Sequence, residues 1–363
     1  MANILITGGT GFLGWEIVKQ LLIDREDKIY LLVRNKSNQY PVGRVDLLLQ
    51  RSFSHSVYLR FKKRIDVIQG DIEENNLGII NSNIKELAKK INVIYHCAAL
   101  CEFNTPLSLV RKINVGGTRN ILNFALLCKE NNSLDYVSHI STISVFGKSG
   151  GTLYENSLNI KQEFNNYYEQ TKFEAENILH KFRQRGLFIN IFRPSSISGH
   201  SKTGEISSIQ MLSQMLYILS LEIFSELPGK RNLQYNLVPV DSVAKATNLI
   251  SFNNQEAYNY HLTNNNNVTL GFFLDTASDF FGFKKPKLIP QEEFNFLCLQ
   301  GFRRRILMPF LSYFNHKETV FDTTNFQKAV TGTEFTWPVV DEKLLFKLFS
   351  YCNRRRFIKR KRI

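Results

Sequence analysis

Cysteine is scarce in this 363-residue sequence, and long apolar runs are absent. The five cysteines are scattered and include no CxxC pair: Cys97, Cys101, Cys128, Cys298 and Cys352. Such a set favours buried free thiols in a reducing cytoplasm over a disulfide framework or a metal site. No stretch reaches the roughly 18 uncharged apolar residues that span a bilayer, because the nearest one, 209–224, is interrupted by polar residues. The N-terminus leads directly into an expected strand, so we expect a cytoplasmic protein without a signal peptide.

Composition is compatible with a folded protein of substantial size. Apolar residues make up 43% of the chain and charged residues 21%, so a sizeable core can form and global disorder is not expected. The length suits one large α/β domain with a smaller lobe, or two small domains. The formal net charge is +14, and seven of the positive charges lie in the last ten residues. Half of the basicity therefore belongs to the C-terminal tail.

The chain is organised around the glycine-rich segment 3–14, Asn-Ile-Leu-Ile-Thr-Gly-Gly-Thr-Gly-Phe-Leu-Gly. An apolar strand runs into the glycines and a segment of helical periodicity follows, which predicts the first half of a dinucleotide-binding βαβ unit. Gly8 lets the chain leave the strand in a conformation that a Cβ opposes. Gly11 lets backbone N–H groups approach a pyrophosphate at the helix N-terminus, and Gly14 lets the helix lie close to the sheet. The candidate cofactor-binding residues of this turn are Gly8, Thr10, Gly11, Phe12, Leu13 and Gly14.

The predicted second strand, 28–34, ends in Arg34, with Lys36 close behind and no carboxylate nearby. In such folds the residue at this position meets the adenine-side ribose, and an acidic residue there selects NAD. An Arg can stack on adenine and donate two hydrogen bonds to a 2′-phosphate. Arg34 therefore favours NADPH as the cofactor, with a solvated surface Arg as the alternative.

Two more strands are predicted at 65–69 and 92–95. Asp71 and Ile72 follow the first, and the Asp71 carboxylate could accept from the adenine amino group or cap the next turn. The sequence does not choose between these two roles. Ala98 and Ala99 follow the second strand, where small side chains would let the backbone lie against a cofactor.

A long helix is expected over 105–129, and it contains Asn114 followed by two glycines. Each glycine inside a helix costs about 1 kcal/mol relative to alanine. Close helix packing or a local bend near the site would explain both glycines. Asn114 is therefore a candidate for a structural-water or proton path in catalysis.

Hydroxyl groups gather after the predicted fifth strand, 134–140, where Ser141 and Thr142 follow. Open α/β sheets place their ligands at this carboxyl edge. His139 lies within the strand, and its position favours a core histidine over a catalyst.

The next helix, from 166 to about 185, carries Tyr168 and Lys172 four residues apart and hence on one face. Tyr167 points about 100° away and has Thr171, not a cation, at the same offset. An ammonium near a phenol lowers a pKa that is otherwise about 10, which makes Tyr168 a usable general acid.

Taken together and in this order, these motifs resemble the extended short-chain dehydrogenases/reductases. Aligning Val145-Phe146-Gly147 with that family's Val-Tyr-Gly implies that Thr142 carries the catalytic hydroxyl, with Ser141 as its neighbour. Within the superfamily, segments 136–146, 192–204 and 238–244 are most similar to the thioester reductases, the relatives of fatty acyl-CoA reductases and of the reductase domains of carboxylic acid reductases. The resemblance covers roughly residues 4–262.

The resemblance implies an α/β fold, a Rossmann-type doubly wound parallel sheet with a smaller, mainly helical C-terminal substrate lobe. We expect an NADP-binding domain over 1–200 that is rejoined by about 235–262, a substrate-binding lobe from 201–234 and 263–350, and a basic tail over 351–363. The expected catalytic residues are Thr142, Tyr168, Lys172 and Asn114. Tyr168 and Lys172 would also hold the cofactor, and the turn at Pro194 and Ser196 would present backbone groups to the nicotinamide carboxamide.

Beyond residue 267 the chain is expected to be helical and contains no catalytic motif. A helix over 207–224 carries Met211, Met215 and Leu219 on one face, where core packing is the default and lining of an acyl pocket the alternative. An apolar helix over 343–351 precedes the basic tail, which could contact anionic lipid, an acidic acyl carrier protein or the phosphates of CoA, or remain solvated. Nucleic acid is not expected, because no binding module accompanies the charge.

The resulting hypothesis is an NADPH-dependent reductase of acyl thioesters on CoA or acyl carrier protein, which forms an aldehyde or an alcohol. The rival is an NAD(P)-dependent nucleotide-sugar epimerase, dehydratase or related dehydrogenase, which can use the same Thr142, Tyr168 and Lys172. Those enzymes commonly hold NAD, so Arg34 counts against them. A protein that binds NADPH without chemistry is a third interpretation, which the intact set of three residues disfavours. The oligomeric state is not readable from the sequence.

Overall fold

The computed structural model describes residues 1–35, 40–102, 105–207, 210–253, 256–264, 268–296, 299–310 and 319–358. Lys36, Cys298 and the last five residues of the basic tail, for which the sequence made predictions, lie outside the described residues.

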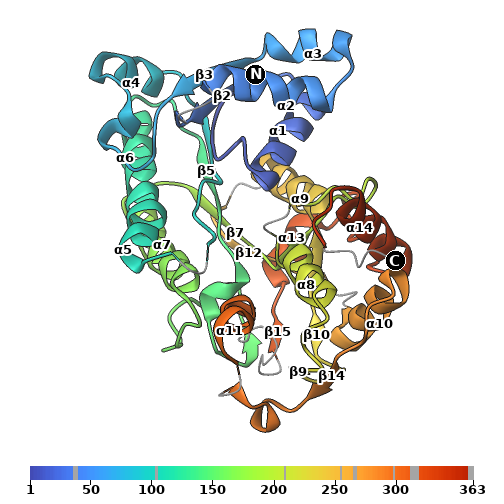
Figure 1. The fold of residues 1–363 in the computed structure, drawn as a ribbon. Coiled ribbons are helices and arrows are strands. Elements are labelled where there is room, and N and C mark those ends of the chain that lie inside the picture. The colour runs from blue at the N-terminus through green and yellow to red at the C-terminus, as the bar shows by residue number, and fades with distance from the viewer. Residues whose placement is uncertain are drawn as a thin grey trace.

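A seven-stranded sheet forms the centre of the larger domain, with the order β12-β7-β5-β4-β1-β2-β3 (Figure 1). Its strands are β1 (Asn3–Thr7), β2 (Lys28–Val33), β3 (Ile65–Gln69), β4 (Val93–His96), β5 (Tyr136–Ile140), β7 (Ile189–Pro194) and β12 (Asn259–Leu262). All of these pairings are parallel. The strand order reverses between β1 and β4, which is where doubly wound sheets bind their ligands.

Helices cover both faces of this sheet because neighbouring strand residues point to opposite sides. Leu5 packs into a core with one set of helices, while Ile4 and Ile6 pack into a core with the other. The first set is α4 (Asn81–Ala88), α6 (Gly117–Glu130) and α7 (Tyr167–Gln184), and the second is α1 (Phe12–Asp24), α2 (Pro41–Ser52), α3 (His55–Lys62) and α9 (Val240–Asn253). The predicted doubly wound fold is confirmed.

The long helix expected over 105–129 is present, with an irregular segment near its start. It comprises α5 (Leu107–Arg111), the π-helical segment η2 (Lys112–Gly116) and α6. A Cβ on Gly117 would lie 2.6 Å from Cδ1 of Ile72. Close packing therefore requires one of the two glycines, and the other ends the π-helical turn.

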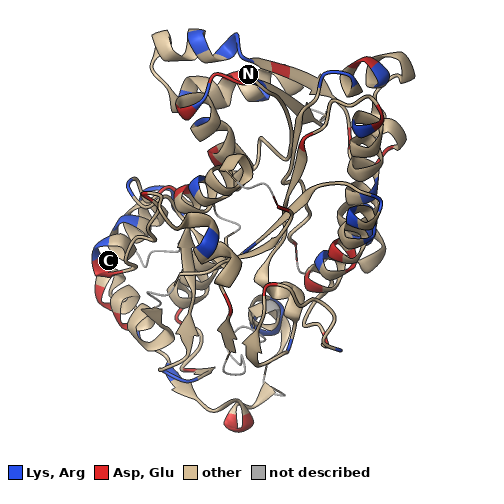
Figure 2. Cartoon of the chain, turned by 180° about the vertical axis from the view of Figure 1, so that it is seen from behind, with Lys and Arg blue, Asp and Glu red and all other residues tan. Residues whose placement is uncertain are grey.

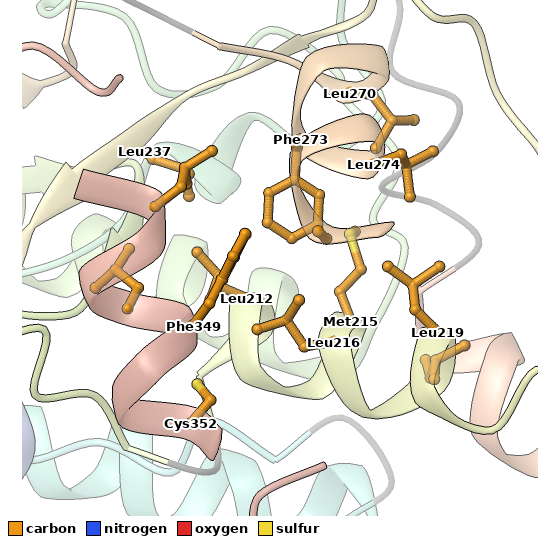
Figure 3. Packing of buried hydrophobic residues seen from close by; sticks show 14 of the residues in the cluster. Leu212, Met215, Leu216, Leu219, Leu237, Leu270, Phe273, Leu274, Phe349 and Cys352 are labelled. Atoms are coloured by element: carbon orange, nitrogen blue, oxygen red, sulfur yellow. The ribbon is translucent and has the colours of Figure 1, made fainter. Parts of the chain in front are cut away.

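The smaller lobe is mainly helical and has its own apolar core. Its helices are α8 (Met211–Ser220), α10 (Leu270–Phe281), α11 (Gly301–Leu307) and α14 (Glu342–Arg354). Two short strand pairs accompany them: β10 (Gln234–Tyr235) with β13 (Val268–Thr269), and β9 (Glu226–Pro228) with β14 (Lys287–Ile289). Figure 3 shows side chains of α8, α10 and α14 meeting in this core, with Phe273 close to Phe349. Met215 and Leu219 are buried there, so core packing, the default interpretation of the α8 stripe, is what the structure shows.

Residues 319–337 pack against the sheet domain, although the sequence assigned them to the substrate lobe. Strand β15 (Thr319–Phe321) pairs with β6 (Gly151–Leu153). Helix α13 (Thr324–Val330) follows and contributes Phe326 to a core with Phe192 of β7 and Tyr260 of β12. Helix α13 lies beside β12, where the Asn325 amide donates to the Asn259 carbonyl oxygen at 3.1 Å. The remaining short elements are β8 (Ser196–Ser198), β11 (Leu237–Pro239), η1 (Asn75–Gly78), η3 (Ile143–Phe146), η4 (Gln291–Glu293) and η6 (Met308–Phe310).

Helix α14 buries the apolar face that the sequence analysis considered for membrane contact. Leu345, Leu348 and Phe349 lie fully buried in the lobe core, and the helix continues to Arg354, so the first residues of the predicted tail are helical. Among the residues described, no helix has the length and apolarity to cross a membrane. Figure 2 shows Lys and Arg spread over outer helices with Asp and Glu among them.

Candidate active site

The turn between β1 and α1 has no room for a side chain at Gly8 or Gly14. Gly8 has a φ of +70°, and a Cβ there would lie 2.6 Å from the backbone nitrogen of Ala98. A Cβ on Gly14 would lie 2.2 Å from the Gly8 carbonyl oxygen. Gly11, which caps α1, donates its N–H to that same oxygen at 2.9 Å. The cradle leaves the positive end of α1 open to an anion, which fits the pyrophosphate of a dinucleotide.

Two arginines meet beside this turn. Arg34 follows β2, is half exposed and lies 3.8 Å from a carboxylate oxygen of Glu73. Arg44, on α2, donates to the Arg34 carbonyl oxygen at 3.0 Å and to the Thr10 hydroxyl at 2.9 Å. Burial and the neighbouring Arg34 lower the pKa of Arg44. An anion bound between these two guanidinium groups would relieve their repulsion. The sequence analysis did not identify Arg44, because no motif marks it.

Asp71 and Ile72 both have structural contacts at the tip of β3. Of the two roles left open for Asp71, capping is present, because its Oδ1 accepts from the Glu73 N–H at 3.1 Å. Ile72 packs on Gly117, and its carbonyl oxygen accepts from the Asn120 amide at 2.7 Å.

Asn114 is a buried clamp between two segments that border the site. Its side chain accepts from the Leu100 N–H at 2.7 Å and donates to the Leu100 carbonyl oxygen at 3.0 Å. The same amide nitrogen lies 3.1 Å from the Thr171 hydroxyl on α7. Asn114 therefore ties the loop that follows Ala98 and Ala99 to the helix that carries Tyr168.

The two hydroxyls after β5 point to different partners. Ser141 donates to the Glu176 carboxylate on α7, whereas Thr142 accepts from the Ser144 N–H at 3.1 Å and caps η3. The Ser141 hydroxyl is therefore bound to a buried carboxylate. Thr142 lies two residues beyond the carboxyl end of β5.

Helix α7 brings Lys172 to the same strand end and carries Tyr168 one turn earlier. Asn166 caps this helix by accepting from the Glu169 N–H at 2.9 Å. Tyr168 is half buried, while Tyr167 is 46% exposed. Lys172 is buried, and its ammonium donates to the Ile140 carbonyl oxygen at 2.7 Å. Burial lowers the pKa of Lys172 to about 8.

His139 is buried in the core, as the sequence favoured, but it also contacts the site. Its Nε2 atom lies 3.2 Å from the Nζ atom of Lys172. Sequence reasoning missed this contact, because strand alternation alone does not show which helix residue faces a given strand residue.

A buried ion pair fixes α7 against β5 and β7. Arg193, which is fully buried, donates from Nε and Nη2 to the Glu176 carboxylate at 2.6–3.1 Å. Its Nη1 donates to the Glu155 carbonyl oxygen at 3.0 Å. Since Glu176 lies one helical turn beyond Lys172, this pair sets the position of the helix face that carries Tyr168.

Pro194 and Ser196 lie where the sequence predicted a turn. Pro194 ends β7, and Ser196 begins β8, which pairs in parallel with β11. The intervening Ser195 N–H donates to the Leu262 carbonyl oxygen at 3.1 Å. The turn is anchored to β12, and its backbone lies at the carboxyl edge of the sheet.

The chain is similar to known proteins in both sequence and fold. The family model described as male sterility protein matches residues 6–247, which hold the glycine turn, Thr142, Tyr168 and Lys172. The chain belongs to the male sterility protein family. Membership makes it an oxidoreductase of the extended short-chain dehydrogenase/reductase type with a domain for a nicotinamide dinucleotide.

A curated relative of this chain is much longer than the chain itself. A glycine betaine reductase from Emericella nidulans is 30% identical over 267 residues, which are 70% of this chain and 20% of that protein. The chain therefore spans about a fifth of the length of that curated relative.

Solved structures match over almost the whole chain. The terminal R domain from the myxalamid PKS-NRPS biosynthetic pathway has a TM-score of 0.84 and 26% identity, with 99% of this chain and 92% of that chain covered. A thiolation-reductase di-domain from an archaeal non-ribosomal peptide synthetase has a TM-score of 0.81 and 22% identity, with 99% and 76% covered, and shows the fold alone.

Proposed function

We propose that this protein is an NADPH-dependent reductase of acyl thioesters carried on CoA or on an acyl carrier protein, with an aldehyde or an alcohol as product. One observation carries the proposal. The Lys172 ammonium is anchored on the Ile140 carbonyl, which brings the Tyr168 face of α7 against the strand end that carries Thr142. The similarity to a glycine betaine reductase and to a terminal R domain supports reduction of an activated carboxyl group.

The residues present fit a nicotinamide dinucleotide. The glycine cradle of Gly8, Gly11 and Gly14 would hold the pyrophosphate, and Lys172 with the turn at Pro194 and Ser196 would border the nicotinamide end. Arg34 and Arg44 would hold a 2′-phosphate, since a guanidinium is suited to bidentate phosphate binding. This pair supports NADPH over NADH.

The site residues would act on the carbonyl oxygen of the thioester. A bound nicotinamide would supply hydride to the carbonyl carbon. Thr142 and Tyr168 would donate hydrogen bonds to the developing oxyanion, and Tyr168 would then transfer its proton to that oxygen. The Lys172 ammonium would stabilise the negative charge left on Tyr168. Collapse of the hemithioacetal would release the thiol and the aldehyde, and a second reduction would give the alcohol.

A carrier-bound thioester is the substrate form that the comparisons support. Relatives include a linear gramicidin synthase subunit from Brevibacillus parabrevis, and the similar structures include a terminal R domain from a PKS-NRPS pathway. The proposal includes a contact of the basic tail with an anionic membrane surface. It does not include binding of nucleic acid.

Cofactor preference separates this proposal from the epimerase or dehydratase. The experiment is a fluorescence titration of the purified protein with NADPH and with NADH, together with a turnover assay on an acyl-CoA. We expect at least tenfold tighter binding of NADPH, because hydrogen bonds from charged groups contribute about 1.5–3 kcal/mol. Preference for NADH, with no oxidation of either cofactor by thioesters, would favour the epimerase or dehydratase.

A further inference from the structure

Two histidines lie side by side beneath the site. His96 of β4 is paired in register with His139 of β5, and their ring centroids are 5.1 Å apart. Both are buried, with 2% and 1% of their surface exposed. Only His139 reaches Lys172, at 3.2 Å between Nε2 and Nζ.

The hydrogen bonds around His96 define its protons. The Thr118 hydroxyl donates to the Asn114 carbonyl oxygen at 2.6 Å, so it must accept from the His96 Nε2–H at 3.0 Å. The Nδ1 atom of His96 then accepts from the Thr7 hydroxyl at 2.7 Å. Burial, followed by Lys172, lowers the pKa of His96 to about 3, so the ring is neutral and its Nδ1 atom has no proton to donate.

The two ring nitrogens of His139 have different surroundings. Among the described residues, its buried Nδ1 atom has no hydrogen-bond partner, and its Nε2 atom faces an ammonium. An ammonium can only donate, so Nε2 must carry the lone pair and Nδ1 the proton. Leaving a buried N–H without an acceptor is unfavourable, which indicates that the contact with Lys172 compensates for it.

We propose that His139 is a positioning residue that holds the Lys172 ammonium through a lone pair on Nε2; this role rests on the proposed function. The Ile140 carbonyl oxygen takes a second proton of the ammonium at 2.7 Å. With two of its three N–H bonds fixed in direction, Lys172 has one left to point toward Tyr168 and the nicotinamide ribose. The backbone carbonyl and the imidazole together define where that bond points.

Other titratable groups around Lys172 leave its charge in place near neutral pH. Burial is the main cause that lowers its pKa, while Cys101, Glu176 and Cys97 oppose the decrease. Burial raises the pKa of the Cys97 thiol to about 12, so this group is neutral near pH 7. Cys101 is an exposed residue. Tyr168 lies on the same face of α7. Burial, followed by Lys172 and His96, lowers the pKa of His139 well below its ordinary value. A neutral imidazole therefore faces a charged amine.

Binding of NADPH as a function of pH tests this role without turnover. We would titrate His139→Phe, His139→Gln and the wild type with NADPH between pH 7 and 10, with His180→Phe as the matched control, since His180 also has a buried ring nitrogen without a partner among the described residues. In His139→Phe the Lys172 ammonium loses one hydrogen-bond acceptor, which makes the charged form less favourable. The affinity of this variant for NADPH should therefore fall at a pH about one unit lower than in the wild type. At pH 8 it should bind NADPH on the order of tenfold more weakly than the wild type. His139→Gln, which offers an amide oxygen, should recover much of this loss. Superimposable profiles for all four proteins would overturn the proposal.

The tautomer of His139 gives a second test that needs no variant for its measurement. Side-chain ¹⁵N shifts of the histidine-labelled wild type should show Nδ1 protonated and Nε2 unprotonated for His139, and the reverse for His96; His139→Gln serves only to assign the signal. A proton on Nε2 of His139 at pH 7 would contradict the proposal. If no thioester is reduced while the tautomer and the NADPH profiles are as expected, the proposed function fails and the role of His139 in holding Lys172 stands.

Discussion

Breaking the buried pair of Glu176 and Arg193 should destabilise the protein far more than breaking a surface pair. Glu176→Gln leaves the Arg193 guanidinium, which is fully buried, without its counter-charge. Removing one partner of a buried pair costs about 3–5 kcal/mol. For 363 residues the entropy of unfolding is about 0.76 kcal/mol/K, so the melting temperature should fall by about 4–7 °C.

A matched control is available on the same helix. Glu174 accepts two hydrogen bonds from Arg111 at 2.7 Å, but these side chains are 26% and 46% exposed. Exposed pairs contribute about 0–1 kcal/mol, so Glu174→Gln should shift the melting temperature by about 1 °C or less. Differential scanning calorimetry and urea titration would measure both variants. Equal shifts for the two variants would refute the reasoning.

The pH dependence of the free energy of unfolding gives a further test of the Glu176–Arg193 pair. Burial alone would raise the pKa of Glu176, but the charge and hydrogen bonds of Arg193 and the Ser141 hydroxyl outweigh it, so the pKa lies below its ordinary value. A carboxyl whose pKa is lowered by folding contributes stability at neutral pH that is lost as the pH falls through the folded-state pKa. The free energy of unfolding of Glu176→Gln should therefore converge on that of the wild type in acid. A gap that stays constant down to pH 3 would contradict this explanation.

Three further predictions concern the site itself. Tyr168→Phe should bind NADPH within about twofold of the wild type and lose about 10²–10⁴ in turnover of a thioester, and wild-type activity in steady-state kinetics would exclude Tyr168 as the acid. Arg34→Ala and Arg44→Ala should each weaken NADPH binding by roughly tenfold or more while NADH binding is unchanged; equal losses for both cofactors would remove the 2′-phosphate from the explanation. Gly14→Ala, whose Cβ would lie 2.2 Å from the Gly8 carbonyl oxygen, should abolish binding of both cofactors in a fluorescence titration, whereas Gly43→Ala has open space and should bind like the wild type.

The sheet was predictable because its strands are short apolar runs, most of which are followed by a glycine or a hydroxyl residue. The strands expected at 28–34, 65–69, 92–95 and 134–140 appear within about two residues of those bounds, and the helix expected from 166 to about 185 is α7. Helices α2 and α3, between β2 and β3, were not among the predictions. Local sequence also selected Tyr168 over Tyr167, because a four-residue offset defines one helix face.

The contacts that complete the site are between residues far apart in the chain. Arg44 reaches Thr10 only because α2 folds back over the turn, and Ser141 faces Glu176 because β5 and α7 pack together. Residues 319–337 pack on the sheet domain through the pairing of β15 with β6 and through Phe326, which is buried beside β7 and β12. Periodicity and motif spacing carry no information on such pairings.

The most direct test of the proposed function is NADPH oxidation by the purified protein with a panel of acyl-CoA and acyl carrier protein thioesters, combined with chromatographic analysis of the products. We expect stoichiometric release of a free thiol and formation of an aldehyde or alcohol with at least one thioester, and loss of both products in Tyr168→Phe. A protein that binds NADPH tightly but consumes none with any thioester in the panel would contradict the assignment as a thioester reductase.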